Sequence, residues 1–341
     1  MLTNLPYKIL IEKKIDDKLE GLLKEMNLGK KCIIICGKNV MDIMGNKIKD
    51  ILSVSFDVEI IEGNIIDKKE LEGFSNKIRD YDFVIGLGGG KSIDIAKYSA
   101  FLEKKPWIAF PTVLSHDGVV SSRASLESDG LKISVDAVEP IAIIADLDTI
   151  KKAPYKRIAA GAGDLISNIS AVEDWRIAAK AGKEDYHTLM AELSLLSAKG
   201  VLEHTTEIKK MDYHGLEILL WSLICSGFAM NIYESSRPCS GSEHNFSHVL
   251  DTKNTGALHG EQVALGSIIM TYLQGKDWGN IKEKMKELGL PTTAKEIGID
   301  KNLLIDALVE SRSVRKRYTI LDEKDITKEK AEYVLKEVGI I

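Results

Sequence analysis

The chain has 341 residues, of which 44% are hydrophobic and 28% are charged. This length and composition are those of a folded protein with one large or two ordinary domains, and they exclude a disulfide-dependent miniature domain and a disordered chain. Lys and Arg together number 46 and Asp and Glu 51, which gives a net charge of −5 and argues against a generally basic surface for nucleic acid.

The N-terminal segment carries no sign of an export signal. Residues 1–14 alternate apolar and polar side chains without a continuous apolar stretch, so we expect a cytoplasmic protein. The longest uncharged stretch has 16 residues, between Glu217 and Glu234. Because a membrane span needs ~20 apolar residues, this stretch predicts a buried helix and no membrane span. The cysteines form no CxxC pair, so free thiols are expected at positions 32, 36, 225 and 239.

As far as about residue 150, short β-branched segments alternate with amphipathic ones. Segments that are apolar throughout and separated by helical patterns are typical of a parallel sheet covered on both faces. Residues 1–153 are therefore predicted to form a doubly wound α/β domain. The expected strands are 32–36, 58–61, 83–87, 107–110 and 141–145, and clear helical patterns occupy 40–52 and 68–79.

Two further patterns complete the predicted organisation. Residues 122–135 contain Asp129-Gly130 between two alternating segments, which predicts a β-hairpin with a tight turn. After Pro154 the strand pattern stops, and helical patterns continue to a charged helix near 328–338. Residues 154–341 are therefore predicted to form an all-α domain.

A glycine-rich loop follows the apolar segment 83–87. Gly88, Gly89 and Gly90 precede Lys91, Ser92 and a helical pattern, so backbone N–H groups and a helix N-terminus are available to bind a pyrophosphate. A Walker A loop is excluded because Ile85 stands where it needs glycine, and the usual dinucleotide motif needs glycine at Lys91. The alternative is a tight turn without a ligand.

Histidines cluster at His244, His248 and His259. The first two share a face if their segment is helical, and the third follows a turn at Gly256. HExxH is excluded because Asn245 follows His244. Two imidazoles with Asp164 would bind a divalent metal and leave an open position for a substrate oxygen. The alternative is that each histidine is a capping or surface residue, as we expect for positions 116, 187, 204 and 214.

Five segments resemble one enzyme superfamily, that of the iron-containing alcohol dehydrogenases, glycerol dehydrogenases and dehydroquinate synthases. The resemblance spans nearly the whole chain, is strongest to the archaeal sn-glycerol-1-phosphate dehydrogenase family, and implies a dehydroquinate synthase-like fold. The segments are 88–94, 111–118, 161–164, 240–244 and 259–261.

The resemblance implies reduction of dihydroxyacetone phosphate by NADH or NADPH to sn-glycerol 1-phosphate, the precursor of archaeal ether phospholipids, by a homo-oligomer with Zn²⁺. It makes residues 1–153 the nucleotide-binding domain and residues 154–341 the metal- and substrate-binding domain. It assigns to the cofactor Gly88, Gly89, Gly90, Lys91, Ser92, Asp94, Thr112, Ser115 and Ser121. It assigns substrate contact to Asp117, Asp164 and His248, catalysis to Asp117 and His248, and the metal to Asp164, His244 and His259.

Several alternatives stay open at this point. Asn168 stands where related dehydrogenases often have a further histidine ligand, which favours three protein ligands. A glycerol dehydrogenase, a dehydroquinate synthase-like lyase and a non-enzymatic nucleotide sensor are the competing functions. Glu62 favours NADH, whereas Lys38 and Lys68 would favour NADPH. The candidate cations for a substrate phosphate are Lys156, Arg157, Arg237, Arg315, Lys316 and Arg317.

Overall fold

The computed structural model describes residues 5–128, 130–253 and 255–341. The chain divides into two compact units, each with its own core. The first comprises the residues up to 114 and residues 118–153, and the second comprises residues 115–117 and 154–341. The short segment 115–117 thus belongs to the helical unit although it precedes residue 153 in sequence.

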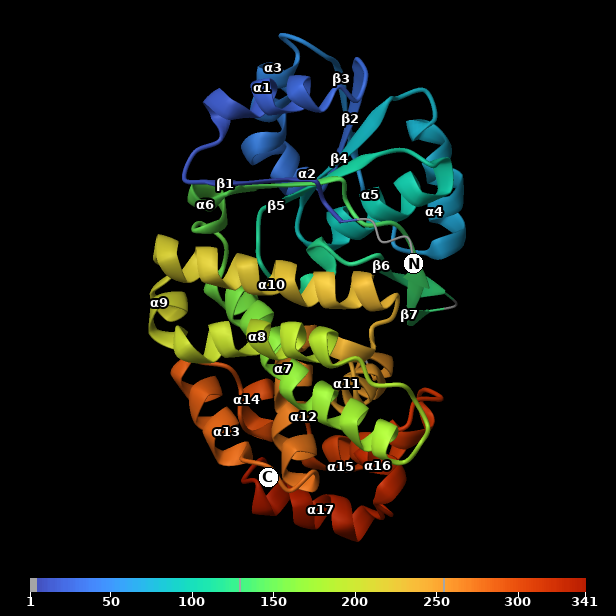
Figure 1. Cartoon of the computed structure of the whole chain (residues 1–341), viewed down its shortest axis with the longest axis vertical. Helices are drawn as coiled ribbons and strands as arrows, with labels where there is room; N and C mark the ends of the chain where they lie inside the picture. The colour runs from blue at the N-terminus through green and yellow to red at the C-terminus, as the bar shows by residue number, and fades with distance from the viewer. Residues whose placement is uncertain (1–4, 129, 254) are drawn as a thin grey trace. The chain divides into compact units, whose positions relative to one another are not determined.

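The first unit is built on a six-stranded parallel sheet in the order β1-β8-β5-β4-β2-β3 (Figure 1). All five predicted strands are confirmed. The sixth, β1, was missed because its apolar segment is only three residues long, Ile9 to Ile11, and its residues are partly exposed at the edge of the sheet, where β1 pairs with β8. The strands are β1 Lys8–Glu12, β2 Lys31–Cys36, β3 Asp57–Glu62, β4 Phe83–Gly88, β5 Trp107–Pro111 and β8 Ala142–Asp146.

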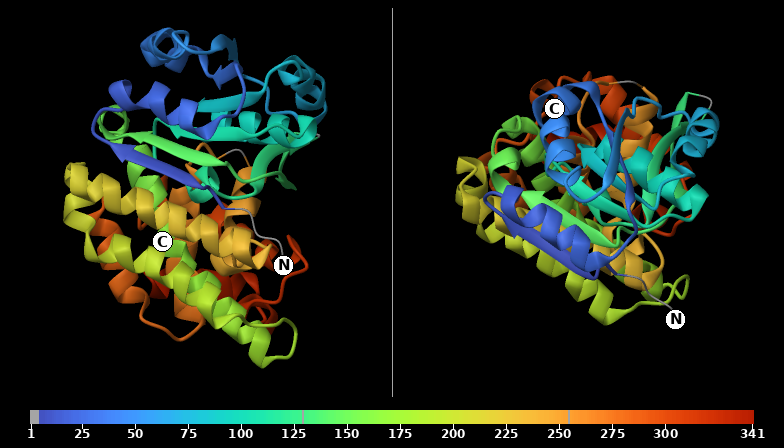
Figure 2. Two further views of the ribbon diagram at one scale, coloured as in Figure 1. Left: turned by 45° about the horizontal axis from the view of Figure 1, so that its top comes forward. Right: turned by 90° about the horizontal axis from the view of Figure 1, so that it is seen from above.

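Helices cover both faces of this sheet, as predicted for a doubly wound domain (Figure 1, Figure 2). Ile85 in β4 packs into a core with α1 and α3, whereas the next residue, Gly86, faces α5. A Cβ at Gly86 would lie 2.8 Å from that of Ala96, so α5 packs tightly on the sheet. The helices are α1 Asp16–Met26, α2 Lys38–Val40, α3 Asn46–Leu52, α4 Lys68–Ser75, α5 Gly90–Glu103 and α6 Leu147–Ile150.

The predicted hairpin is confirmed as the antiparallel pair β6 Arg123–Ser128 and β7 Leu131–Asp136. Gly130 of its turn has φ +76°, and Asp129 lies outside the described residues. A fully buried lysine, Lys97 of α5, fastens the start of this segment to the sheet. Its Nζ pairs with Asp94 at 3.1 Å and donates to the carbonyl oxygens of Gly118 at 2.5 Å and Arg123 at 2.6 Å.

The second unit is helical, as the sequence predicts. Its longest helix, α7, packs against α8 and α12. The helices are α7 Tyr155–Lys180, α8 Thr188–Glu203, α9 Thr205–Lys210, α10 Tyr213–Tyr233, α11 Ser242–Thr252, α12 His259–Leu273, α13 Trp278–Glu287, α14 Ala294–Ile297, α15 Lys301–Glu310, α16 Ile320–Glu323 and α17 Lys328–Glu337.

Two glycines allow α7 and α12 to approach closely. A Cβ at Gly163 would lie 2.4 Å from the carbonyl oxygen of Gly260, and a Cβ at Gly260 would lie 1.8 Å from that of Ala160. Gly161 and Gly163 precede Asp164 but do not mark the start of a helix, since Asp164 is the tenth residue of α7. Glycine beside it serves helix packing rather than helix initiation.

The uncharged stretch 218–233 lies in α10, whose length and hydropathy are sufficient to cross a membrane. However, 67% of its most apolar window is buried inside the fold. The helix packs against α8 and α7. The prediction of a buried helix is therefore confirmed.

Candidate functional site

Three helices of the second unit bring Asp164, His244 and His259 together. Oδ1 of Asp164 lies 3.9 Å from Nε2 of His244 and 3.6 Å from Nε2 of His259. The two imidazole rings lie 5.1 Å apart at an angle of 61°. Tetrahedral zinc with bonds of ~2.0–2.1 Å separates its ligand atoms by roughly 3.3 Å, so only small shifts are needed to fit these three atoms around one ion.

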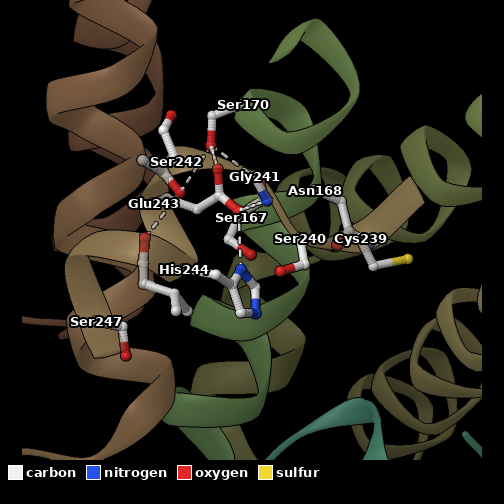
Figure 3. A network of polar contacts seen from close by, with 12 residues as sticks. Ser167, Asn168, Ser170, Cys239, Ser240, Gly241, Ser242, Glu243, His244 and Ser247 are labelled. Atoms are coloured by element: carbon white, nitrogen blue, oxygen red, sulfur yellow. Dashed lines mark hydrogen bonds and ion pairs between the residues drawn. The ribbon is translucent and has the colours of Figure 1, made fainter. Parts of the chain in front are cut away.

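In each imidazole, Nε2 faces Asp164 and the other nitrogen, Nδ1, is hydrogen-bonded within the protein. His244 Nδ1 lies 2.8 Å from Glu243 Oε1, and His259 Nδ1 lies 3.1 Å from Ser247 Oγ. Figure 3 shows the Glu243 carboxylate beside the His244 ring, with Ser247 on the same helix. The Glu243 carboxylate can only accept, so Nδ1 of His244 donates and, in the neutral ring, Nε2 carries the lone pair that a metal needs. The Ser247 hydroxyl can donate or accept, and it accepts from Nδ1 of His259 when Nε2 of His259 is the ligand.

Glu243 is a fully buried carboxylate with several donors around it. Besides His244, it accepts from the N–H of Gly241 at 2.6 Å and from the hydroxyl of Ser170 at 2.9 Å (Figure 3). Burial acts to raise the pKa of Glu243, but the hydrogen bond and charge of His244 outweigh burial, and the pKa lies below its ordinary value. Glu243 is therefore ionised and stabilises positive charge on the His244 side.

Asp164 has the opposite electrostatic situation. Burial and the nearby charge of Asp117 raise its pKa well above the ordinary value, although the Asp117 N–H donates to it at 3.0 Å. A buried carboxylate that faces two imidazole nitrogens and a second acid is stabilised by a proton or by a cation. The donor set, two imidazoles and one carboxylate, fits a divalent metal ion.

Asp117 and Asn168 complete the polar surroundings of Asp164. Ser226 donates its hydroxyl to Oδ2 of Asp117 at 2.7 Å, which fixes this carboxylate near the ligands. Asn168, one helical turn after Asp164, donates to the hydroxyls of Ser197 at 2.9 Å and Ser226 at 3.2 Å. Its amide is thus used to join α7 to α8 and α10, which agrees with three protein ligands.

His248 lies one turn after His244 on α11 and is half-buried. Its Nε2 is hydrogen-bonded to the guanidinium of Arg315. A guanidinium can only donate, so Nε2 of His248 accepts this bond and, in the neutral ring, Nδ1 carries the proton. The sequence singled out His248 and Arg315 separately, and the structure pairs them.

The glycine loop of the first unit has the backbone that the sequence predicts. Gly88 ends β4 with φ +144°, a conformation that favours glycine, and a Cβ there would lie 2.8 Å from Ser92 Oγ. Helix α5 then begins at Gly90 with no side-chain cap among the described residues. The first N–H groups of such a helix are available to an anion.

The other predicted cofactor residues belong to both units. The N–H of Thr112 donates to the carbonyl oxygen of Gly88 at 3.0 Å, which places Thr112 next to the glycines. Ser121 is buried, and Ser115 belongs to the second unit. The carboxylate of Asp94 accepts from Lys97 and, at 3.3 Å, from the N–H of Ser125.

Glu62 ends strand β3 at the same carboxyl edge of the sheet as the glycine loop. Strand β2 separates them: Cys36 pairs with Glu62 on one side and with Leu87 on the other. Glu62 accepts a hydrogen bond from Asn64. This edge position is the one at which an acidic residue contacts a ribose in doubly wound folds.

The other histidines with described contacts, His187, His204 and His214, contact only backbone or aromatic groups in these contacts. His204 Nδ1 lies 2.9 Å from the carbonyl oxygen of Gly200, and its ring lies 5.4 Å from that of His214. The ring of His187 lies 6.4 Å from that of Tyr233. The residues that sequence reasoning missed are Glu243 and Ser247, and the available signal was a carboxylate directly beside a candidate ligand.

Residues 10–154 match the family model described as iron-containing alcohol dehydrogenase. The NAD(P)+ glycerol-1-phosphate dehydrogenase of Pyrococcus horikoshii is 41% identical over 344 residues, which cover 100% of this chain and 99% of that protein. The chain belongs to the glycerol-1-phosphate dehydrogenase family. The enzyme of that name from Methanosphaera stadtmanae is 40% identical and covers 97% of this chain, with 95% of its own length matched.

Solved structures of low sequence identity share the fold. The glycerol dehydrogenase of Schizosaccharomyces pombe superposes with a TM-score of 0.80 at 20% identity, over 99% of this chain and 90% of that one. The predicted superfamily and the predicted fold class, an α/β unit followed by a helical unit, are both confirmed. Within the superfamily, membership of this family favours a dehydrogenase over a dehydroquinate synthase-like lyase.

Proposed function

We propose that the protein reduces dihydroxyacetone phosphate with NADH or NADPH to sn-glycerol 1-phosphate, the precursor of archaeal ether phospholipids. The observation that carries this proposal is 41% identity over the full length of a glycerol-1-phosphate dehydrogenase. The convergence of Asp164, His244 and His259 supports it because this chemistry uses a metal-polarised carbonyl.

Asp164, His244 and His259 would hold the metal, which we propose to be Zn²⁺ because two imidazoles and a carboxylate are a common catalytic zinc set. When bound, the ion supplies Lewis-acid stabilisation of the negative charge that develops on the carbonyl oxygen. Glu243 and Ser247 orient the two rings. Asp164 and Asp117, joined by a backbone hydrogen bond, would contact the substrate hydroxyl and carbonyl groups.

Hydride addition leaves an alkoxide that needs a proton, and we assign its delivery to His248 or to a water that His248 holds. Because Arg315 donates to Nε2 of His248, the transferable proton of the neutral ring is on Nδ1. This N–H would hold the alkoxide or a water molecule by a hydrogen bond, and the proton itself would come from that water, which regains one from solvent.

The cofactor pyrophosphate would lie against Gly88, Gly89, Gly90, Lys91 and Ser92, where the N-terminus of α5 stabilises negative charge. Thr112 is held beside Gly88 and would contact the cofactor, as would Ser115 and Ser121. Glu62 at the neighbouring strand end supports NADH, whereas the exposed Lys38 would accept NADPH.

The test is an assay of dihydroxyacetone phosphate with each reduced cofactor, followed by chiral analysis of the product. We expect net oxidation of the cofactor, formation of sn-glycerol 1-phosphate, and loss of turnover when a chelator removes the metal. A lyase would return the cofactor unchanged, and turnover by metal-free protein would contradict the assigned role of Asp164, His244 and His259.

On the same family grounds we propose a cytoplasmic homo-oligomer. Large apolar side chains of the second unit are exposed on α8 and α10: Leu189 is 69% exposed, Leu196 58% and Trp221 41%. Such residues are typical of surfaces that a partner covers. Sedimentation of the purified protein should show a species larger than one chain, and a purely monomeric profile would contradict this.

A further inference from the structure

We propose that Arg315 is the residue that binds the phosphate group of the substrate, with the hydroxyl of Ser240 as a second donor. This inference rests on the proposed function, since it concerns which residue recognises the phosphate of dihydroxyacetone phosphate. It selects one of six cations that the sequence left equivalent.

Direct contact with a proposed substrate residue separates Arg315 from the other cations. Arg237 is 2% exposed, pairs with Glu184 at 2.6 Å and donates to two backbone carbonyls, so its charge is used inside the protein. Lys156 pairs with Glu261 at 3.3 Å. Arg157 and Lys316 are exposed surface residues. None of these four is bonded to a proposed substrate residue among the contacts described.

Arg315 contacts a proposed substrate residue directly. One Nη donates to Nε2 of His248, and the other donates to Ser240 Oγ at 3.1 Å. His248 and the metal ligand His244 are four residues apart on α11, a rise of ~6 Å. In dihydroxyacetone phosphate only one carbon and one oxygen separate the carbonyl carbon from phosphorus. The two lengths are similar, so we infer that a substrate whose carbonyl lies beside His244 extends its phosphate toward His248 and Arg315.

The chemistry of the guanidinium suits this task. Its five N–H donors lie in one plane, so it can hold its protein partners along one edge and a phosphate along another. Arg315 donates to an imidazole and to a hydroxyl, which are neutral acceptors. A dianionic phosphate beside them would add an ion pair with the guanidinium.

A second arginine, Arg317, adds positive charge near Arg315. Arg317 donates to the carbonyl oxygen of Ser240 at 2.6 Å and to Ser236 Oγ at 3.1 Å, both neutral acceptors. Burial, followed by the charges of Arg315 and Arg237, lowers the pKa of Arg317 to about 10. Positive charges that repel one another in a buried site are relieved when an anion binds. Ser240 links both arginines, which places the proposed anion beside its hydroxyl.

The test compares Arg315→Met with a control, Arg312→Met. The control removes an exposed arginine that lies three residues before Arg315 and pairs with Asp322. Kinetics are measured with dihydroxyacetone phosphate and with unphosphorylated dihydroxyacetone. For Arg315→Met we expect the KM for the phosphorylated substrate to rise about 10- to 100-fold. The KM for NADH and NADPH should stay within about 2-fold of the wild type, as should every parameter of the control. The rate with dihydroxyacetone should fall only through loss of the Arg315–His248 hydrogen bond, and so by a smaller factor than kcat/KM for dihydroxyacetone phosphate.

Three results would overturn the inference. An unchanged KM for dihydroxyacetone phosphate would show that Arg315 does not bind its phosphate. An equal loss with both substrates would show that Arg315 acts only through His248. A rise confined to the KM for NADPH would place the cofactor's phosphate there. Failure of the wild type to reduce dihydroxyacetone phosphate at all would instead contradict the proposed function.

A second variant keeps the test available if Arg315→Met does not fold. Arg315→Lys retains the charge but loses the planar pair of donors, so the KM for dihydroxyacetone phosphate should rise severalfold, with a smaller change in the rate with dihydroxyacetone. Inorganic phosphate should compete with dihydroxyacetone phosphate in the wild type and compete at least 10-fold less well in Arg315→Lys. Equal inhibition of both proteins by phosphate would overturn the inference.

Discussion

The chemistry of the metal centre depends on single residues that do not themselves bind the ion. Glu243 and Ser247 are the hydrogen-bond partners of Nδ1 of His244 and of His259, so Nε2 of each ring remains for the ligand position. The two partners differ in charge. An ionised, buried Glu243 makes His244 a stronger donor to a metal than a hydroxyl partner would.

Glu243→Gln should therefore weaken metal binding. We expect the affinity for Zn²⁺ to fall about 10- to 100-fold, because a neutral amide replaces the carboxylate behind His244. Competition with a chromophoric chelator measures this directly. The matched control is Glu173→Gln, which removes a carboxylate of α7 paired with Arg176 at 3.4 Å and Lys276 at 3.3 Å. Equal affinities in Glu243→Gln and the wild type would contradict the assigned role.

The raised pKa of Asp164 predicts how the metal-free protein responds to pH. The native state holds the Asp164 proton more tightly than the unfolded state does, so this group's contribution to stability is lost as pH rises from the ordinary carboxyl pKa through the raised one. A bound metal reverses the preference, because it needs the ionised carboxylate. Metal affinity should therefore increase with pH over the same range.

Asp164→Asn separates these effects. At neutral pH we expect the metal-free variant to unfold at a higher temperature than the metal-free wild type, because the side chain at position 164 can no longer carry a buried charge. We expect its metal affinity to fall at least 100-fold. Thermal unfolding in the presence of a chelator, measured at several pH values, checks the first part. A lower unfolding temperature for the variant at neutral pH would show that the Asp164 charge is compensated by the protein itself.

At the scale of elements, the ligands are placed by the contact between α7 and α12. Helix α7 carries Asp164 and α12 begins at His259, and the two helices meet at Gly163 and Gly260 with no room for a side chain. Small residues where two helices cross allow the helix axes to approach closely, so side chains from both helices can reach one point.

Gly260→Ala should damage both stability and the metal site. Its Cβ would lie 1.8 Å from the carbonyl oxygen of Ala160, so the helices must separate. We expect the free energy of unfolding to fall by about 1–3 kcal/mol and metal affinity to fall with it. The control Gly21→Ala lies on α1 with nothing within 4 Å and should raise stability by about 0.5–1 kcal/mol. Denaturant titration measures both, and a stable Gly260→Ala protein with full metal affinity would disprove the packing argument.

At the scale of the whole molecule, the two binding tasks lie in different units. Asp164, His244 and His259 all belong to the second unit, whereas the glycine loop and α5 belong to the first. The cofactor residue Ser115 is the exception, and it lies in the short segment 115–117 of the second unit. Catalysis needs both units, but binding of the nucleotide does not need the metal.

Chelator-treated protein should therefore still bind NADH, with a dissociation constant within about 3-fold of the metal-loaded protein, while it has no turnover. Fluorescence of the reduced nicotinamide measures binding, and added Zn²⁺ should restore activity. If nucleotide binding disappears together with the metal, the glycine loop and the metal centre are coupled more strongly than this division predicts.

The local patterns of the sequence were sufficient for the elements and for the chemistry of each segment. Apolar segments predicted five of the six parallel strands, Asp129-Gly130 predicted the hairpin of β6 and β7, and the four-residue spacing of His244 and His248 predicted a shared helix face. The edge strand β1 was missed because its apolar segment, Ile9 to Ile11, is short and partly exposed. These features depend on neighbours along the chain, so periodicity reveals them.

Contacts between distant residues were decided only by the tertiary structure. The sequence offered six equivalent cations, and packing placed Arg315 against His248, 67 residues away. Likewise, no local pattern pairs Gly163 with Gly260, whereas the fold brings these two glycines into contact and so brings Asp164 and His259 together. The physical reason is that such pairs share no periodicity: they meet because hydrophobic faces of separate helices pack in one particular arrangement, and that arrangement selects which polar groups become neighbours.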